Sequence, residues 1–264
     1  MDEPGTIYFT GTAGAGKTSL VSAFRSWLTT AGYSASILNL DPGSESTTLQ
    51  PDIDIREWVR LPEVMEEYDL GPNGAQVAAA DLVALKVFEV KQALSELHSD
   101  YVLVDTPGQI ELFAFRESSK AILEALSGDR SLIAFLFDPT LAKSPSGFVS
   151  LLMLSATVEF RFRLPTFNLL TKTDLLTPAQ IAEVLAWGED PEVLTDAVER
   201  DGPTPEVQLS SGVFRAIQSM APLMTLLPTS SRDLSGLEPL YRHIQQIFQG
   251  GEDLELSHAP PEDG

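Results

Sequence analysis

The sequence predicts an α/β fold in which a mostly parallel sheet is covered by helices on both faces. Three observations support this prediction. Short apolar runs rich in β-forming residues alternate with helical patterns along the chain. The predicted strands are almost continuously apolar, as strands are when both faces of a sheet are buried. The chain has 264 residues, of which 43% are hydrophobic, enough for one sizeable domain and short for two.

The predicted elements mostly alternate between strand and helix. Strands are expected at residues 6–10, 35–39, 101–105, 132–137, 166–170 and 223–227. Helices are expected at residues 18–29, 75–97, 117–126, 147–158, 178–187, 211–220 and 235–248. Residues 188–205 are polar and acidic, and we interpret them as a surface insertion that contains a short helix.

One domain is expected over residues 1–249, because no repeat or shift in composition marks a second one. Residues 250–264 hold three glycines, two prolines and five acidic residues with few apolar ones. That composition cannot bury a core, so we expect a disordered acidic tail.

The composition restricts the environment and the partners. With 38 acidic and 17 basic residues, the formal charge is −21, which disfavours direct binding to nucleic acid or to an anionic membrane. The same charge is compatible with general solubility, with salt adaptation or with docking of a partner. The chain has no cysteine, its first residues do not resemble a secretory signal, and its apolar runs have strand length. We therefore expect a cytoplasmic protein with no membrane segment.

A phosphate-binding loop is the strongest signal. Residues 11–18 read GTAGAGKT, a full match to GxxxxGK[ST], between a predicted strand and a predicted helix. The glycines let successive N–H groups converge on phosphate oxygens, and the start of the helix adds a positive dipole end. Lys17 would contact the β- and γ-phosphates, and the Thr18 hydroxyl would ligate Mg²⁺. The predicted nucleotide-binding residues of this loop are Gly11, Thr12, Ala13, Gly14, Ala15, Gly16, Lys17, Thr18 and Ser19.

A second motif, DTPGQ at residues 105–109, follows the predicted strand 101–105 and would therefore lie beside the loop. Asp105 would hold the metal through water. The Gly108 N–H could bond the γ-phosphate and so report its presence, which would make residues 110–116 a switch. Read alone, the same tetrapeptide Asp-Thr-Pro-Gly is an ordinary turn sequence.

A third motif would read the base. Residues 171–174, TKTD, nearly match the guanine-reading pattern NKxD. Asp174 can accept from N1–H and N2–H₂ of guanine, whereas adenine would leave the carboxylate unpaired. Lys172 would lay its methylenes over the purine. Thr171 replaces the asparagine amide, so a donor to N7 that also braces the P-loop is lost. The alternative is that Lys172 and Asp174 only cap the next helix.

Other candidates surround these motifs. The segment at Ser230 follows a predicted strand, where a backbone N–H would meet guanine O6. Asp41 follows another strand and could reach the Mg²⁺ shell or orient water, although an acid before proline also opens turns. Gln109, Glu111 and Asp41 are the candidates for positioning the attacking water. Gln109 is favoured because a loose phosphoryl transition state needs positioning more than a strong base.

With these residues in place, the chain resembles the GPN-loop GTPases, a branch of the signal-recognition-particle-like class of P-loop proteins. Gly71, Pro72 and Asn73 match the motif that names this family, and DTPGQIELF at residues 105–113 resembles its second switch. Residues 39–43 resemble its first switch. The similarity runs from about residue 6 to residue 249. It implies the three-layer sandwich of P-loop proteins and GTP, GDP and Mg²⁺ as ligands.

The resemblance also implies a homodimer in which the Gly-Pro-Asn loop of one protomer enters the partner's site. Asn73 would then stabilise the transferring phosphoryl group in trans. Without the family, the tripeptide is simply a loop before a helix. Some related proteins carry a lysine early in the P-loop that crosses the dimer, and Thr12 stands there instead.

The sequence is compatible with four functions. The leading one is a GTP-hydrolysing switch that serves a protein client, which the resemblance suggests could be RNA polymerase or its assembly machinery. The second is a partner-binding assembly factor or chaperone with slow or incidental hydrolysis. A nucleotide or polynucleotide kinase needs a basic acceptor site, and arginine clusters are few. A metal-delivery GTPase needs cysteine or histidine ligands, and the chain has no cysteine and three scattered histidines.

Overall fold

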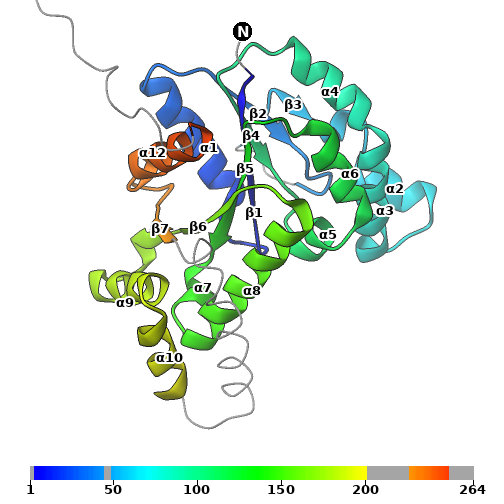
Figure 1. The fold of residues 1–264 in the computed structure, drawn as a ribbon. Helices are drawn as coiled ribbons and strands as arrows, with labels where there is room; N and C mark the ends of the chain where they lie inside the picture. The colour runs from blue at the N-terminus through cyan, green and yellow to red at the C-terminus, as the bar shows by residue number, and fades with distance from the viewer. Residues whose placement is uncertain (1–2, 45–48, 201–225, 250–264) are drawn as a thin grey trace, which may run out of the picture.

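The chain folds into three layers, with a sheet between two sets of helices (Figure 1). The computed structural model describes residues 3–44, 49–200 and 226–249. In this described part the sheet has seven strands, all parallel, in the order β3-β2-β4-β1-β5-β6-β7. The predicted fold class is confirmed.

The strands are short and mostly buried, and the helices follow them along the chain. The strands are β1 (Gly5–Gly11), β2 (Ala35–Asn39), β3 (Ile53–Asp54), β4 (Tyr101–Asp105), β5 (Ser131–Phe137), β6 (Thr166–Leu170) and β7 (Leu226–Pro228). The helices are α1 (Lys17–Thr30), α2 (Leu61–Glu67), α3 (Pro72–Leu85), α4 (Val87–Glu96), α5 (Ile110–Ala114), α6 (Glu117–Leu126), α7 (Pro139–Ala142), α8 (Pro145–Phe162), α9 (Pro178–Glu189), α10 (Pro191–Arg200) and α12 (Leu237–Phe248). Two 3₁₀ turns lie at Ile55–Glu57 and Thr173–Leu175.

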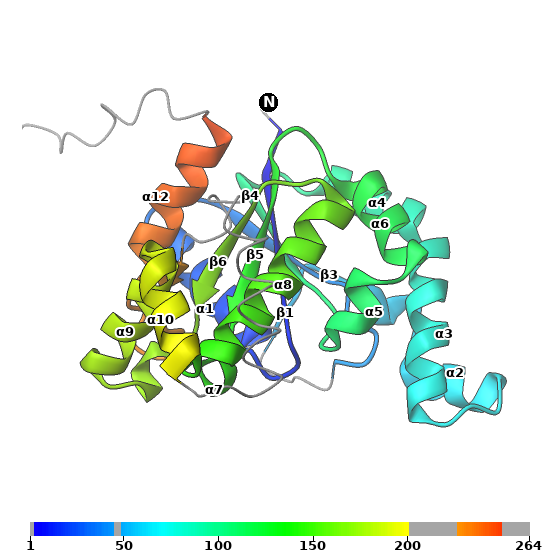
Figure 2. The same cartoon turned by 60° about the horizontal axis from the view of Figure 1, so that its bottom comes forward.

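Alternate residues of the central strands bury against different helical layers, because successive side chains of a strand point to opposite faces. Tyr8 of β1 belongs to a core cluster with residues of α3, α6 and α8. Ile7 and Phe9, its neighbours, belong to a second cluster with α1 and α12. Figures 1 and 2 show these two layers on opposite sides of the sheet. The two cores hold the carboxyl ends of the strands at one edge, where the predicted site lies.

Three elements between residues 50 and 100 differ from the prediction. The expected helix at 75–97 is two helices, α3 and α4, separated at Lys86. There the backbone leaves helical geometry, and the Lys86 N–H bonds to the Val83 carbonyl three residues back. The prediction missed β3 and α2, since a two-residue strand and a seven-residue helix are too short to show periodicity.

Other differences lie at the ends of elements. Helix α8 begins at Pro145 and runs to Phe162, beyond both predicted ends. The predicted strand 223–227 is described only from Leu226, and β7 continues to Pro228. Part of the predicted insertion 188–205 forms α10. The predicted helix 211–220 and the predicted tail 250–264 lie outside the described residues. No helix in the described ranges is long and apolar enough to span a bilayer.

Candidate nucleotide site

The P-loop connects β1 to α1 at the carboxyl edge of the sheet. Gly11 has φ 151°, and a β-carbon there would lie 2.8 Å from the Leu136 carbonyl oxygen of β5. Gly16 has φ 94°, a left-handed conformation that glycine adopts without strain, and α1 begins at the next residue. Local backbone therefore requires glycine at both ends of the loop, and the N-terminus of α1 follows directly.

Lys17 lies inside the loop rather than in solvent. Its Nζ donates to the carbonyl oxygens of Gly11 and Thr12, each at 3.0 Å, and to that of Gly108 at 3.4 Å. Burial lowers the pKa of the Lys17 ammonium, and the carboxylates of Asp105 and Asp41 oppose that shift. These neutral acceptors can be exchanged for phosphate oxygens, as the predicted phosphate contact requires.

Thr18 and Asp105 form a pair of oxygen groups beside the loop. The Thr18 hydroxyl donates to Asp105 Oδ2 at 2.7 Å. The other carboxylate oxygen, Oδ1, is buried and has no hydrogen-bond partner within the described ranges. Burial raises the pKa of Asp105 to about 6, while the Thr18 hydrogen bond and the Lys17 charge lower it. A hydroxyl and a carboxylate without a full set of partners fit Mg²⁺, which prefers oxygen ligands.

Asp41 joins the loop after β2 to the segment after β4. Its Oδ1 accepts from the Gly43 N–H at 2.9 Å, and its Oδ2 accepts from the Gly108 N–H at 3.1 Å. Burial raises the pKa of Asp41, and these two amide hydrogen bonds oppose it. The Gly108 N–H is the group predicted to report the γ-phosphate. Asp41 and a γ-phosphate would thus compete for one donor.

The segment after Gly108 is partly helical. Residues 110–114 of the predicted switch form α5, and Gln109 just before it is exposed. Glu111 lies in α5, but its side chain is outside the described part of the structure. Thr106 is buried and donates to the Phe9 carbonyl at 2.8 Å, which ties the start of this segment to β1.

The base-reading motif lies against the P-loop. The Thr171 hydroxyl donates to the Ala15 carbonyl at 2.8 Å, so the brace expected to be lost with asparagine is supplied by a hydroxyl. Lys172 Nζ bonds to Asp138 at 2.6 Å and to the Gly14 carbonyl. Its Cε would lie 3.4 Å from a β-carbon on Gly16. The Lys172 stem therefore covers the loop, next to where a base would stack.

Asp174 is held by groups from the loop after β7. The Ser230 hydroxyl donates to Asp174 Oδ1 at 2.9 Å, and Arg232 Nη1 lies 3.9 Å from Oδ2. The Ser230 N–H, predicted to meet guanine O6, donates to the Ser235 carbonyl at 3.0 Å. The alternative was that Lys172 and Asp174 only cap the next helix. Thr177 caps α9 in a capping box with Gln180, and Lys172 occupies the N-cap position of the 3₁₀ turn Thr173–Leu175 without a side-chain capping bond.

Comparisons with known proteins decide the family. A model described as a conserved hypothetical ATP binding protein matches residues 9–250. A GPN-loop GTPase of Pyrococcus abyssi is 31% identical over 236 residues, which cover 89% of this chain and 93% of that relative. The chain belongs to the GPN-loop GTPase family.

Two further matches agree with this family. A crystal structure of a GTPase in apo form from Pyrococcus abyssi has a TM-score of 0.82 at 30% identity, covering 91% of this chain and 96% of that one. A GPN-loop GTPase of Arabidopsis thaliana is 35% identical over 194 residues, which cover 72% of this chain and half of that relative. The description of the family model names ATP binding, whereas the relatives are named GTPases.

The GPN tripeptide opens a helix in this family member. Gly71 is the N-cap residue of α3, Pro72 occupies the first turn, and Asn73 follows it and is exposed. A β-carbon on Gly43 would lie 3.9 Å from Nε2 of Gln76, one turn further along α3. The start of α3 thus approaches the loop that carries Asp41.

Four site residues of this GPN-loop protein were not predicted. Asp138 pairs with Lys172, and Asn39, Asp54 and Arg56 form a network around the Asp41 loop. Asp138 follows the buried strand β5, the same signal that identified Asp105, and could have been found. Asn39 opens the segment that resembles the family's first switch, but no role was predicted for it, and Asp54 and Arg56 carry no motif that we recognised.

Replacing Asp174 by asparagine should change base choice. Asp174→Asn would present an amide where guanine N1–H and N2–H₂ need acceptors, so GTP affinity should fall by about tenfold or more. The affinity for XTP should rise, because the 2-oxo group of xanthine can accept a hydrogen bond from the new amide. Competition binding with GTP, XTP and ATP measures this, with Asp190→Asn in an exposed position after α9 as the control. An unchanged GTP preference would show that Asp174 does not read the base.

Proposed function

We propose that this GTPase binds GTP with Mg²⁺ and hydrolyses it as a homodimeric switch in the cytoplasm. The observation that carries the proposal is the grouping of Lys17, Asp105 and Asp41 at the P-loop. Lys17 and Asp41 both bond to Gly108, and Asp105 accepts from Thr18, the residue after Lys17. One cation and two carboxylates at a phosphate-binding loop are suited to phosphoryl transfer, in which positioning and charge stabilisation do most of the work.

The phosphates would be bound by the N–H groups of the P-loop, with Lys17 moving its donors from carbonyl oxygens to phosphate oxygens. Thr18 and Asp105 would hold Mg²⁺, directly and through water, and Asp41 would lie near its shell. When bound, the ion neutralises charge on the β- and γ-phosphates. Burial raises the pKa of Asp105 and so disfavours its ionised form, whereas the Lys17 charge favours ionisation, and a bound second cation would favour it further.

Guanine would be recognised by Asp174, with Ser230 holding the carboxylate in place. Lys172 would pack along the purine, and Thr171 would keep the P-loop against β6. Recognition by a carboxylate favours guanine over adenine, which agrees with the names of the relatives rather than with the ATP in the family description.

The attacking water would be positioned by Gln109, Asp41 or Glu111. The Asp41 contact with the Gly108 N–H supports a role for Asp41, because it places a carboxylate next to Gln109 and the phosphate end of the site. A γ-phosphate that takes the Gly108 N–H would release one Asp41 oxygen. Asp41 would then orient water or the metal shell only when GTP is bound, which couples the switch to the nucleotide.

The partner's GPN loop would complete the site. Asn73 is exposed in the single chain, and α2 and α3 lie at the edge of the molecule opposite α9 and α10 (Figure 2). An exposed amide at this edge is accessible to a second chain. A neutral amide donor there could stabilise the phosphoryl transition state as an arginine finger does with charge.

A second function is a partner-binding assembly factor in which hydrolysis is slow or incidental. Such a factor needs an apolar docking surface, and Leu85, Phe88 and Phe160, which are 73%, 74% and 68% exposed, are candidates for it. A protein client, with RNA polymerase or its assembly machinery suggested by the family resemblance, would bind either to a switch or to an assembly factor.

One experiment separates these functions. GTP and ATP turnover would be measured with Mg²⁺ and with chelator, and the molar mass would be followed by light scattering in GTP and GDP. Mg²⁺-dependent, GTP-selective turnover by a dimer supports the switch. A dimer that binds GTP but hydrolyses it no faster than GTP hydrolyses without protein would favour the assembly factor. A protein that stays monomeric with both GTP and GDP would overturn the proposal that the partner's GPN loop completes the site.

A further inference from the structure

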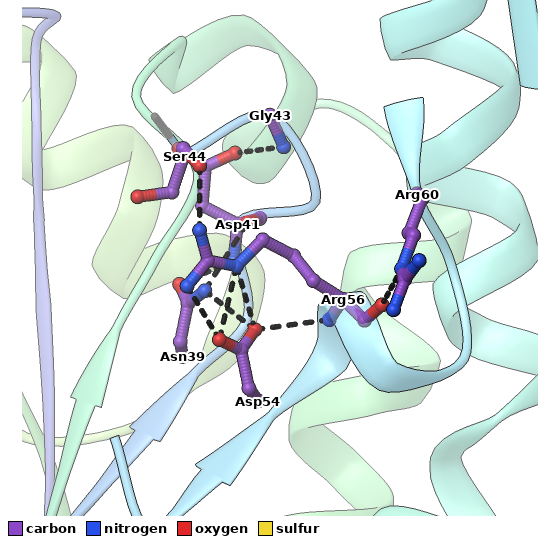
Figure 3. Close-up of polar contacts among 7 residues, drawn as sticks. All are labelled: Asn39, Asp41, Gly43, Ser44, Asp54, Arg56 and Arg60. Atoms are coloured by element: carbon purple, nitrogen blue, oxygen red, sulfur yellow. Dashed lines mark hydrogen bonds and ion pairs between the residues drawn. The ribbon is translucent and has the colours of Figure 1, made fainter. Parts of the chain in front are cut away.

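The loop that carries Asp41 is held by a connected set of polar contacts (Figure 3). It begins at the end of β2 and turns at Pro42 and Gly43. On one side it borders a pocket of about 480 Å³, whose lining includes Ser44, Arg56 and Leu61. Packing alone therefore does not enclose this loop, and directional contacts must determine where it lies.

Asn39 holds the backbone of Asp41 at the start of the loop. Its Oδ1 accepts from the Asp41 N–H at 3.0 Å, and its Nδ2 donates to the Asp41 carbonyl at 3.3 Å and to Asp54 Oδ1 at 3.0 Å. An ionised carboxylate accepts hydrogen bonds and cannot donate them, so Asp54 selects the amide orientation in which Nδ2 faces it. The amide oxygen of Asn39 then faces the Asp41 N–H.

Arg56 holds both Asp54 and the loop at Ser44, three residues after Asp41. Its Nε lies 2.9 Å from each oxygen of Asp54, and its Nη1 donates to the Ser44 carbonyl at 2.8 Å. The planar guanidinium can make these contacts together, because its donors have a fixed fork geometry. Arg56 is thus the one side chain of this network that touches both the carboxylate orienting Asn39 and the backbone of the loop at Ser44.

A second arginine at the same edge of the sheet provides a comparison. Arg25 also bonds a carbonyl, that of Gln50 at 2.9 Å, and a carboxylate, that of Asp52 at 3.1 Å. Asp52, however, accepts from the Ile37 N–H in the middle of β2 and not from a loop residue. The two arginines therefore stabilise neighbouring parts of the edge, and only the Arg56 network reaches Asp41.

We propose that Arg56 is a positioning residue for GTP hydrolysis, which acts through Asp54 and Asn39 and through Ser44 to keep Asp41 at the phosphate end of the site. The proposal rests on the proposed function, because it assumes that Asp41 acts on the water or the metal shell. It adds that a change at Arg56 should slow GTP hydrolysis without weakening nucleotide binding. The P-loop and Asp174 bind the nucleotide without this network, whereas the geometry of Asp41 depends on it.

The test compares Arg56→Gln and Arg56→Lys with the matched control Arg25→Gln in the full-length protein. For Arg56→Gln, kcat for GTP should fall by about tenfold or more, as is typical when a group that orients a functional residue is removed. GTP affinity should stay within about twofold, because no nucleotide contact is lost. Arg56→Lys keeps the charge without the fork and should recover part of kcat. Arg25→Gln should keep both values.

Amide exchange provides a readout that does not depend on turnover. The Gly43 N–H bonds to Asp41 Oδ1, so its exchange should become faster in Arg56→Gln and stay unchanged in Arg25→Gln. Adding Asp54→Asn to Arg56→Gln should lower kcat no further, since both act through one network.

The outcomes separate two failures. Wild-type GTP turnover no faster than that of Lys17→Ala would overturn the proposed function, and the inference with it. If the wild type is active, an Arg56→Gln kcat equal to that of Arg25→Gln overturns the inference alone. An equal loss of GTP affinity and of kcat would also overturn it, because Arg56 would then support the whole site rather than Asp41 alone. A kcat loss that is fully additive with Asp54→Asn would contradict the shared network.

Discussion

Lys17→Ala should lose GTP turnover by about 100-fold or more while the chain stays folded. Lys17 is the cation of the P-loop, and removing a group that stabilises transition-state charge commonly costs that much. The residue is almost fully buried, yet its contacts are to backbone carbonyl oxygens that belong to the phosphate-binding loop. Steady-state phosphate release and circular dichroism of the same samples measure the two parts of this prediction.

Two further variants test whether the loss of turnover comes from the missing charge at this position. Lys17→Met keeps the methylene stem and removes only the charge, so it should lose turnover as alanine does. Lys91→Ala, an exposed position on α4, removes one positive charge elsewhere and should keep the wild-type rate. Wild-type turnover in Lys17→Met with an intact fold would overturn the assignment of the P-loop.

The parts of this site that could be predicted from the sequence are those determined by a few consecutive residues. The P-loop needs glycine where φ is positive and lysine one residue later, so GTAGAGKT identifies it without knowledge of the tertiary structure. Asp105 and Asp174 are found in the same way, because each follows a buried strand and lies in a short motif. Their positions at one edge follow from the parallel order of the sheet.

The network around Asp41 could not be predicted because it depends on contacts between distant residues. Asn39 and Asp54 are 15 positions apart, and Asp41 and Gly108 are 67 apart. The strand β3, which places Asp54 beside Asn39, has two residues and no periodicity. The break between α3 and α4 was missed for a related reason, since Lys86 interrupts a pattern that stays apolar and helical on both sides.

Thr171 shows how a correct comparison of motifs can still mislead. Because threonine lacks the asparagine amide, we expected the brace to the P-loop to be lost. The end of β6 places the Thr171 hydroxyl close enough to donate to the Ala15 carbonyl, and a short side chain is sufficient there. Sequence gives the type of donor, whereas the backbone decides how far that donor must reach.

The GPN loop provides the other prediction of a large effect. Asn73→Ala should bind GTP normally and hydrolyse it about 100-fold more slowly, as expected when a donor to the transition state is removed. The exposed position of Asn73 means that no core contact is lost. Glu66→Ala, an exposed residue at the end of α2, is the matched control and should keep the wild-type kcat. Nucleotide affinity and single-turnover rates measure the two parts.

Mixing Asn73→Ala with Lys17→Ala decides whether the loop acts on its own site or on that of a partner. In a mixed dimer, the protomer with an intact P-loop can receive Asn73 only from the other chain. Action in trans therefore predicts GTP turnover in the mixture that neither variant shows alone, up to about half the wild-type activity per mixed dimer because one of its two sites is intact. Action in cis predicts no recovery, since each chain lacks one of the two groups that its own site needs.

The mixture is informative only when the subunits have exchanged and the mixed dimer binds nucleotide. Each variant would carry a different affinity tag, so that mixed dimers can be isolated by two successive captures and their GTP content measured before turnover. The amount of mixed dimer then sets the expected rate, and dilution should lower dimer and turnover together. Mixed dimers that form and hold GTP, but hydrolyse it no faster than the two separate variants, would rule out the trans role of Asn73. The GPN tripeptide would then be a start of α3 with Pro72 in its first turn, a role that turn chemistry explains without a partner.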